Sequence, residues 1–329
     1  SCLVLIIFFV LFSGVIVLLL RLGRLRHIYA ILIVAFGAVA ISGCDKGVPE
    51  EAEVLYHFGR SGRGQCEFIY PRGIDIAAEG LLYVVDKTGR IQKFTPEGDF
   101  LSVVQMPRVE KGLPTGLSAA RDGRLFVADT HYHRVVVFSV DGDLLGEFGR
   151  FGQDGGCFIY PTDIAFAPDG RIFVSEYGGN DRISIFDGDG QFISSFGSPG
   201  SGEAQFSRPS AVCVDDVRKC LYIADACNHR IAVYDLQGGL LRYIGEPGRE
   251  QGQLRYPYDL SLQANGTIVV CEYGNNRIQL FDPSGESLGV CGSAGRQLGQ
   301  LAYPWGVAVR GNRAFIVDAG NDRIQVWRL

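Results

Sequence analysis

The 329-residue sequence predicts an all-β fold, a six-bladed β-propeller of four-stranded antiparallel blades, and three observations support this prediction. Residues 161–197 read as four short strands, because apolar residues recur with period two, β-branched and aromatic residues are enriched, and Asp/Gly turns separate the segments. This unit recurs at intervals of about 43 to 48 residues, the spacing of propeller blades. A strand that the last unit lacks is found ahead of the first unit.

Each unit opens with a proline, ends its second strand with a carboxylate and begins its third strand with an arginine. The opening residues are Pro71, Pro114, Pro161, Pro209, Pro257 and Pro304. The carboxylates are Asp86, Asp129, Glu176, Asp225, Glu272 and Asp318, and the arginines are Arg90, Arg134, Arg182, Arg230, Arg277 and Arg323. An arginine–carboxylate pair that occurs in every unit indicates a structural role, because a ligand site needs residues that differ between units. We therefore expect these pairs to clamp the loop between the second and third strands.

The two ends of the array predict how the ring closes. The sixth unit stops at Leu329, directly after its third strand at 323–329, and so lacks a fourth strand. Residues 54–59, VLYHFG, match the fourth strands at 145–149 and 194–197. We expect residues 54–59 to complete the last blade, which removes exposed sheet edges and gives a monomeric ring over 54–329.

The residues around the third strand resemble the NHL repeat. The similarity is carried by Asn228-His229-Arg230-Ile231 and by the segments at 274–280 and 320–326, which contain Asn-Asn-Arg-Ile and Asn-Asp-Arg-Ile. It extends over roughly residues 54–329. The resemblance implies a six-bladed propeller used mostly as a recognition surface and occasionally as an enzyme scaffold, and it implies no particular reaction.

The N-terminal region, residues 1–44, is hydrophobic and predicts one or two helices. Residues 2–20 carry no charge and are long enough to span a bilayer. Arginines at 21–26 precede a second apolar run, so that residues 21–43 read as a signal peptide. Whether the run at 2–20 belongs to the mature protein is left open by the sequence.

This region ends in Ile41-Ser42-Gly43-Cys44, which resembles the lipobox of bacterial lipoproteins and implies lipidation of Cys44. The alternative is an ordinary membrane helix that ends at a cysteine. Residues 45–53 are polar and read as a short tether. We expect the protein to be anchored to a membrane in the cell envelope, with its propeller outside the cytoplasm.

The charge of the chain disfavours nucleic acid as a partner. All 36 acidic residues follow Cys44, whereas three of the 31 basic residues precede it, so the net charge after Cys44 is near −8. Nucleic-acid binding needs clustered Lys and Arg. Nine cysteines could suggest disulfides, but several stand where other repeats have small or apolar residues, and we expect no disulfide framework, with only Cys220 and Cys227 as a possible pair.

Long Gly-rich loops between the fourth strand of one unit and the first of the next emerge on one face of the ring. They lie at 60–65, 150–156, 198–205, 246–253 and 293–300. Variable loops on a rigid scaffold usually carry recognition, and we expect this long-loop face to bind the ligand. The alternative is that the loops only join the blades.

Two units differ from the others near the predicted channel mouth on that face. Two residues after the opening proline they have Asp163 and Asp259, where other units have Gly or Ala, and their second strands end in Glu-Tyr-Gly. The candidate binding residues are therefore Arg72, Asp163, Glu176, Tyr177, Tyr258, Asp259, Glu272, Tyr273 and Trp305. Carboxylates and aromatic rings together could hold a cation, a sugar or a basic peptide segment. The alternative is that each Asp accepts hydrogen bonds from loop backbone or pairs with a repeat arginine.

These observations predict a membrane-tethered scaffold that binds a protein, peptide or glycan and needs no cofactor. The alternative is a metal-dependent hydrolase or lyase with a divalent cation at the channel mouth, which Asp163 and Asp259 keep open. No zinc centre can readily be assembled from His57, His131, His133 and His229, because three of these lie in or beside the repeat motif and His57 lies in a fourth strand.

Overall fold

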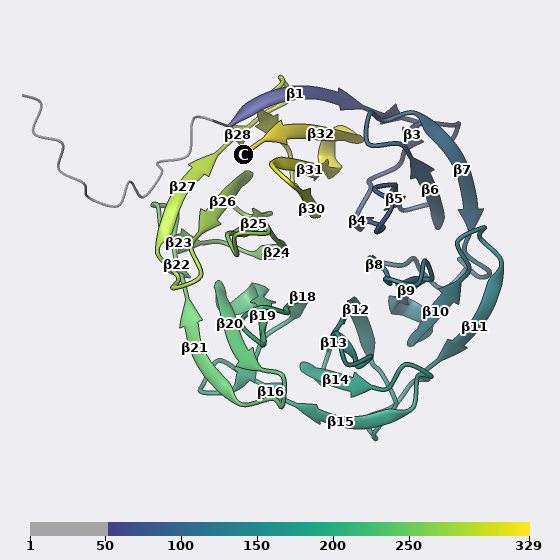
Figure 1. The fold of residues 1–329 in the computed structure, drawn as a ribbon, viewed down its shortest axis with the longest axis vertical. Coiled ribbons are helices and arrows are strands. Elements are labelled where there is room, and N and C mark those ends of the chain that lie inside the picture. The colour runs from purple at the N-terminus through teal and green to yellow at the C-terminus, as the bar shows by residue number, and fades with distance from the viewer. Residues whose placement is uncertain (1–51) are drawn as a thin grey trace, which may run out of the picture. The chain divides into compact units, whose positions relative to one another are not determined.

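The computed structural model describes residues 52–329, which form a ring of six four-stranded antiparallel sheets (Figure 1). The predicted six-bladed propeller is confirmed. The helices expected within residues 1–44, including the run at 2–20, the signal peptide at 21–43 and the lipidated Cys44, lie outside the described residues. Between residues 52 and 329, no helix has the length and apolar character to cross a bilayer.

Each blade places its first strand at the central axis and its fourth at the rim (Figure 1). Blades 1 and 2 are β4 (Ile74–Ile76), β5 (Leu82–Val85), β6 (Arg90–Phe94), β7 (Phe100–Gln105), and β8 (Gly116–Ala119), β9 (Leu125–Asp129), β10 (Arg134–Phe138), β11 (Leu144–Phe148). Blades 3 and 4 are β12 (Tyr160–Phe166), β13 (Ile172–Tyr177), β14 (Arg182–Phe186), β15 (Phe192–Phe196), and β18 (Pro209–Asp215), β19 (Cys220–Asp225), β20 (Arg230–Asp235), β21 (Leu240–Ile244). Blades 5 and 6 are β24 (Pro257–Leu262), β25 (Ile268–Glu272), β26 (Arg277–Phe281), β27 (Ser287–Cys291), and β30 (Val307–Arg310), β31 (Arg313–Asp318), β32 (Arg323–Arg328), β1 (Glu53–Phe58).

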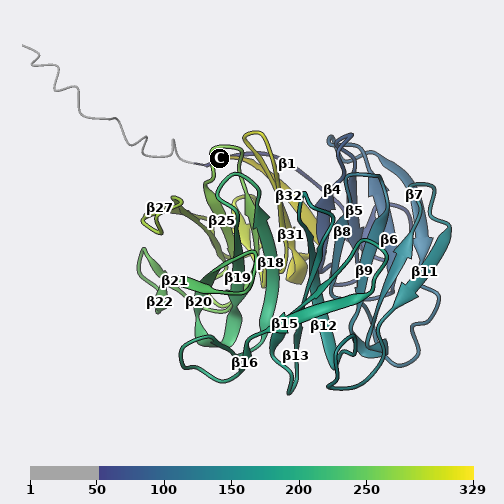
Figure 2. The same ribbon diagram turned by 60° about the horizontal axis from the view of Figure 1, so that its bottom comes forward.

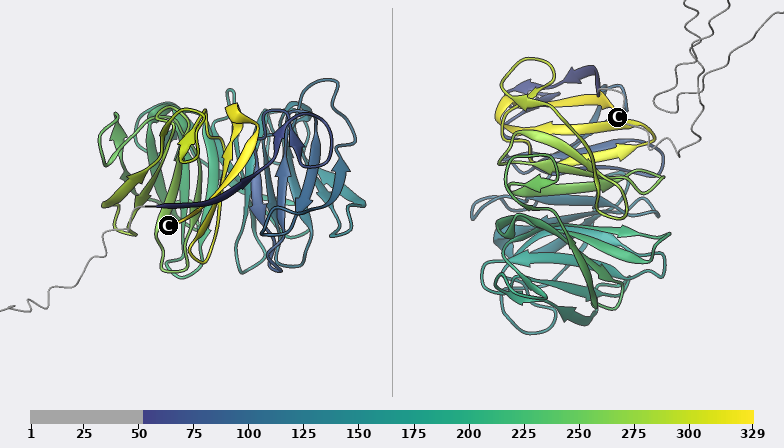
Figure 3. Two further views of the ribbon diagram at one scale, coloured as in Figure 1. Left: turned by 90° about the horizontal axis from the view of Figure 1, so that it is seen from above. Right: turned by 90° about the vertical axis from the view of Figure 1, so that its left-hand side faces the viewer.

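The ring closes by the exchange that the sequence predicts. Strand β1 pairs antiparallel with β32, with Glu53 opposite Arg328 and Phe58 opposite Ile324, and so supplies the fourth strand of blade 6 (Figure 3). The strand begins at Glu53, one residue earlier than expected, so that the last residue of the predicted tether belongs to the sheet. Because β1 covers the free edge of β32, the first and last segments of the ring hold each other.

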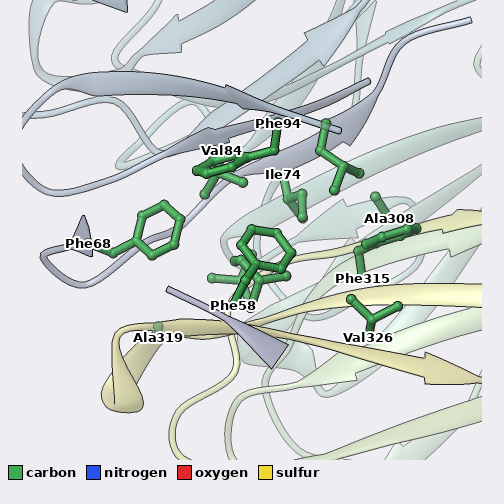
Figure 4. Close-up of a cluster of buried hydrophobic side chains, with 12 residues drawn as sticks. Phe58, Phe68, Ile74, Val84, Phe94, Ala308, Phe315, Ala319 and Val326 are labelled. Atoms are coloured by element: carbon green, nitrogen blue, oxygen red, sulfur yellow. The ribbon is translucent and has the colours of Figure 1, made fainter. Parts of the chain in front are cut away.

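Apolar side chains fill the spaces between neighbouring blades, and the closing interface is packed in the same way. One buried cluster joins Phe58 of β1 and Phe315 of β31 to Phe94 of β6 and to Phe68, which precedes blade 1 (Figure 4). The ring centroids of Phe58 and Phe94 lie 5.1 Å apart. Burial of a large aromatic ring contributes about 1.5–3 kcal/mol, so this cluster adds a hydrophobic seal to the strand exchange.

The strands run through the thickness of the ring, and the long connections link the rim of one blade to the axis of the next (Figure 2). Several of these connections fold back on themselves in parallel strand pairs. The pairs are β2 (Arg60–Ser61) with β3 (Glu67–Phe68), β16 (Ser198–Pro199) with β17 (Gln205–Phe206), β22 (Glu246–Pro247) with β23 (Gln253–Leu254), and β28 (Ser293–Ala294) with β29 (Gln300–Leu301). The long-loop face is therefore built of ordered loops.

Candidate functional site

The repeated arginine–carboxylate pairs hold the long loops in place, which confirms their structural interpretation. All six ion pairs are formed, and in each pair the carboxylate is almost fully buried. In blade 4, Arg230 Nε donates to Asp225 Oδ2 at 2.9 Å, and the rest of the guanidinium donates to three carbonyls of the 198–205 loop. The same carboxylate accepts the Ser207 amide at 2.7 Å. In five of the six blades the arginine thus fixes the loop that leads into its own blade, and not only the turn between the second and third strands. In blade 2, Arg134 bonds Asp129 and Glu147 instead.

A second repeated contact joins consecutive blades on this face. The residue before the repeat arginine accepts the amide N–H of the residue before the next opening proline. The pairs are Asp181 with Arg208 (2.7 Å), His229 with Tyr256 (3.1 Å), Asn276 with Tyr303 (2.7 Å) and Asp322 with Tyr70 (2.6 Å). All eight residues have a positive φ between 33° and 58°. Such conformations persist where surrounding contacts enforce them, and of these eight residues Arg208 lines the central cavity.

The six first strands surround a cavity of about 260 Å³ along the central axis. The glycines near the opening prolines allow these strands to approach one another: a Cβ on Gly116 would stand 2.2 Å from the Thr162 carbonyl oxygen of the next blade. The wall includes Asp163 and Asp259, as the sequence suggests, and also Asp75, Cys213 and Ser261. This cavity is referred to below as the channel.

The aspartates of the channel join alternate pairs of blades. Asp163 Oδ2 accepts the Val212 amide of blade 4 at 3.0 Å, and Asp259 Oδ2 accepts the Val307 amide of blade 6 at 2.8 Å. Asp75 does the same from blade 1, accepting the Ala119 amide of blade 2 at 2.8 Å. Asp75 was missed because it lies two residues further along its strand than Asp163 and Asp259 do. Residues two apart in a strand point to the same face, so the sequence could have indicated that Asp75 also faces the channel.

Burial and mutual repulsion make these carboxyl groups hard to ionise. Burial raises the pKa of Asp75 to about 6, against the pull of its two amide donors. Burial also raises the pKa of Asp163 to about 7 and that of Asp259 well above its usual range, and the charges of the other channel aspartates add to both increases. The channel therefore carries less negative charge near neutral pH than its composition suggests.

The two glutamates of the predicted site lie elsewhere. Glu176 and Glu272 are fully buried, and each accepts the repeat arginine of its own blade, Arg182 Nε at 2.7 Å and Arg277 Nε at 2.5 Å. Their remaining oxygens accept loop amides and asparagine side chains. The structure thus gives them partners other than Asp163 and Asp259, beside which the sequence placed them.

The aromatic residues of the predicted site do come together. The rings of Tyr258 and Tyr273 stack at 4.5 Å between centroids, and Trp305 packs edge-on against Tyr258 at 4.8 Å. The Arg72 guanidinium lies 4.9 Å from the centre of the Trp305 ring. Tyr177 lies on the other side of the channel, in blade 3.

Arg208, which was not predicted, connects these two sides. Its guanidinium lies 4.9 Å from the Tyr177 ring centre and 5.1 Å from that of Tyr258. Together with Arg72 and Trp305 these residues line one end of the channel, and this group of five is called the mouth below. The mouth is therefore aromatic and cationic, whereas the sequence suggested aromatic rings with carboxylates.

The described histidines and cysteines form no metal site. Among residues 52–329, no group of three or more His, Cys, Asp or Glu side chains has a geometry that could hold a metal ion. His57 lies in the outer strand β1, and His131, His133 and His229 bond backbone groups of neighbouring loops. The seven cysteines of the described region are free thiols, so that the possible pair of Cys220 and Cys227 is not formed.

Comparison with known sequences finds two matches to family models. Residues 164–247 match a 6-bladed beta-propeller family, and residues 112–138 match the NHL repeat. A 123-residue segment is 32% identical to peptidyl-glycine alpha-amidating monooxygenase B of Xenopus laevis. That segment covers 35% of this chain and 13% of the relative.

Comparison with solved structures finds the same fold in several proteins. Virginiamycin B lyase from Staphylococcus aureus is 17% identical with a TM-score of 0.57, and 78% of this chain and 79% of that chain are covered. A streptogramin B lyase is 16% identical with a TM-score of 0.61 and coverage of 83% and 97%. A protein of unknown function from Bacteroides thetaiotaomicron is 13% identical with a TM-score of 0.64 and coverage of 84% and 76%. The chain therefore has the six-bladed β-propeller fold, and its residues 112–138 match the NHL repeat.

Proposed function

We propose that this protein is a binding module that recognises a protein, peptide or glycan on its long-loop face, with one group of the ligand entering the mouth. The observation that supports this proposal is the mouth itself, where two arginines and three aromatic rings border a cavity of about 260 Å³. Concave sites that combine aromatic walls with a few polar groups are typical of ligand binding. The clamped loops around the mouth supply a rigid frame, which lowers the entropic cost of binding.

The polar groups of the channel favour binding over catalysis. Asp163 and Asp259 are engaged with backbone amides of neighbouring blades, and Glu176 and Glu272 are paired with arginines. Burial raises the pKa of the Cys213 thiol far above its usual value, so that the thiolate is not available as a nucleophile near neutral pH. A metal-dependent hydrolase or lyase would need carboxylates that are free to bind the cation, and the described carboxylates of the channel already have other partners.

The proposal also places the propeller outside the cytoplasm on a lipid anchor. It rests on the resemblance of residues 41–44 to a lipobox and on the export-type sequence before it. An intact-mass spectrum of the membrane-bound protein tests this part. A diacylglyceryl modification on Cys44 supports it, and an unmodified Cys44 in the membrane form contradicts it.

Binding can be tested with peptide and glycan arrays probed with the full-length protein in detergent. The variant Tyr258→Ala/Trp305→Ala removes two walls of the mouth, and Leu101→Ala, on the exposed rim strand β7, is the control. We expect specific array signals that the double variant loses and the control keeps. Equal signals from all three proteins contradict the proposal, and signals that depend on added divalent metal and decay by turnover favour the enzyme alternative.

A further inference from the structure

We infer that the mouth binds an oxyanion at the end of the ligand, a phosphate, sulfate or carboxylate group, through Arg72 and Arg208. This inference rests on the proposed function, because it names the chemistry recognised at the same site. It reverses the expectation of a bound cation that the aspartates in the sequence suggested.

Within residues 52–329, the two arginines of the mouth lack the carboxylate partners that the repeat arginines have. In the described region, each of the six repeat arginines is paired with a buried carboxylate. No ion pair or side-chain hydrogen bond within residues 52–329 is found for Arg72, and its buried Nε has no partner there. A buried polar group without a partner is costly, and such groups occur where a ligand supplies the missing bond.

Aromatic rings contact both arginines of the mouth. Arg72 lies against Trp305, and Arg208 lies between Tyr177 and Tyr258. A guanidinium that contacts a ring through its face keeps its N–H groups at the edge, where they can donate in parallel to two oxygens. The aromatic residues thus hold both guanidinium groups in place without satisfying them.

The electrostatic environment of the mouth also favours an anion. Burial lowers the pKa of Arg72, and the positive charge of Arg208 lowers it further. An anion between these two groups relieves both effects, whereas a cation increases them. The aspartates deeper in the channel do not compensate, because their oxygens accept backbone amides and their raised pKa values reduce their charge.

The size of the cavity limits what enters. A volume of about 260 Å³ is below the usual range for whole drug-sized ligands, so the channel admits an end group and not an entire ligand. The aromatic rings beside the arginines suit a planar or apolar portion next to the anionic group. Phenyl phosphate and benzoate combine both features and serve as probes.

The test measures binding of phenyl phosphate, benzoate and benzylammonium to the full-length protein in detergent by titration calorimetry. The variants are Arg72→Ala and Arg208→Ala, and the matched control is Arg150→Ala, which removes an exposed arginine from another loop of the same face. We expect an anionic probe to bind and both mouth variants to weaken it at least tenfold, with no change in the control. The tighter of the two anionic probes identifies the ligand group as phosphate-like or carboxylate.

The inference is overturned if benzylammonium binds as well as the anions, or if the mouth variants bind the anions as the wild type does. If the double variant Tyr258→Ala/Trp305→Ala then still loses array binding, the proposed binding function is supported and only the anionic nature of the ligand is refuted. If that double variant also keeps array binding, both proposals fail. A urea denaturation curve for Arg72→Ala guards against misfolding, because a cooperative unfolding transition shows that the variant is folded.

Discussion

Replacement of Arg230 by alanine is expected to cost about 3–5 kcal/mol of unfolding free energy, the range for breaking a buried ion pair from one side. Asp225 is fully buried, and the Arg230 guanidinium that lies 2.9 Å from it is 14% exposed. The variant also loses three hydrogen bonds to carbonyls of the 198–205 loop and a contact with the Tyr243 ring at 3.8 Å. The carboxylate keeps its amide and asparagine donors, which places the expected loss toward the lower end of the range.

The pH dependence of this loss gives a sharper test. Burial already raises the pKa of Asp225 in the presence of Arg230, and removal of the arginine raises it further. When the pKa of a carboxyl group is higher in the folded state than in the unfolded state, its ionisation destabilises the fold. This destabilisation is absent below the unfolded-state pKa and complete above the folded-state pKa. We therefore expect Arg230→Ala to lose more stability at pH 8 than at pH 5.

Urea unfolding followed by tryptophan fluorescence measures both quantities, with Arg150→Ala as the exposed control. The double variant Asp225→Asn/Arg230→Ala should recover part of the loss at pH 8, because it removes the uncompensated charge. A loss below 1 kcal/mol at pH 8, or a larger loss at pH 5, would refute the structural role of the repeat arginine.

Three further predictions concern closure of the ring and the channel. Phe58→Ala should lower the free energy of unfolding in urea by about 3–5 kcal/mol, because it opens the hydrophobic contact between blades 6 and 1. The control Leu101→Ala, at a side chain 47% exposed, should change it by less than about 0.5 kcal/mol. Equal effects of the two substitutions would contradict the proposed closure. Asp322→Ala leaves the Tyr70 amide without its acceptor and should cost about 1–3 kcal/mol, and unchanged stability would show that the contact between blades is dispensable. The pKa of Asp75 is about 6 in the folded protein and 3.8 is its ordinary value, so the wild type loses stability as the pH rises from 4 to 7. Relative to the wild type, Asp75→Asn should gain up to about 3 kcal/mol of unfolding free energy over that interval. A stability difference that does not depend on pH would contradict the raised pKa.

The fold could be predicted from the amino-acid sequence, because the features that define a blade are local. Period-2 alternation, the turn residues and the interval between opening prolines such as Pro161 and Pro209 all act within one unit of fewer than about 50 residues. The Arg230–Asp225 pair could be predicted for the same reason, since a turn of four residues brings the two side chains together. Closure by residues 54–59 followed from the count of strands.

The chemistry of the mouth could not be predicted in this way, because its contacts run between blades. Asp163 and Glu176 of the same blade were predicted to belong to one site, but the Asp163 carboxylate bonds Val212, 49 residues away in the next blade. Arg208 reaches the channel because the contact of its amide with Asp181 sets an unusual backbone conformation, which no local pattern indicates. The alternation of a strand shows which side chains face inward, whereas the curvature of a closed ring determines which neighbour they meet. The aspartates are therefore used between blades, whereas Arg72 and Arg208 form no ion pair within residues 52–329.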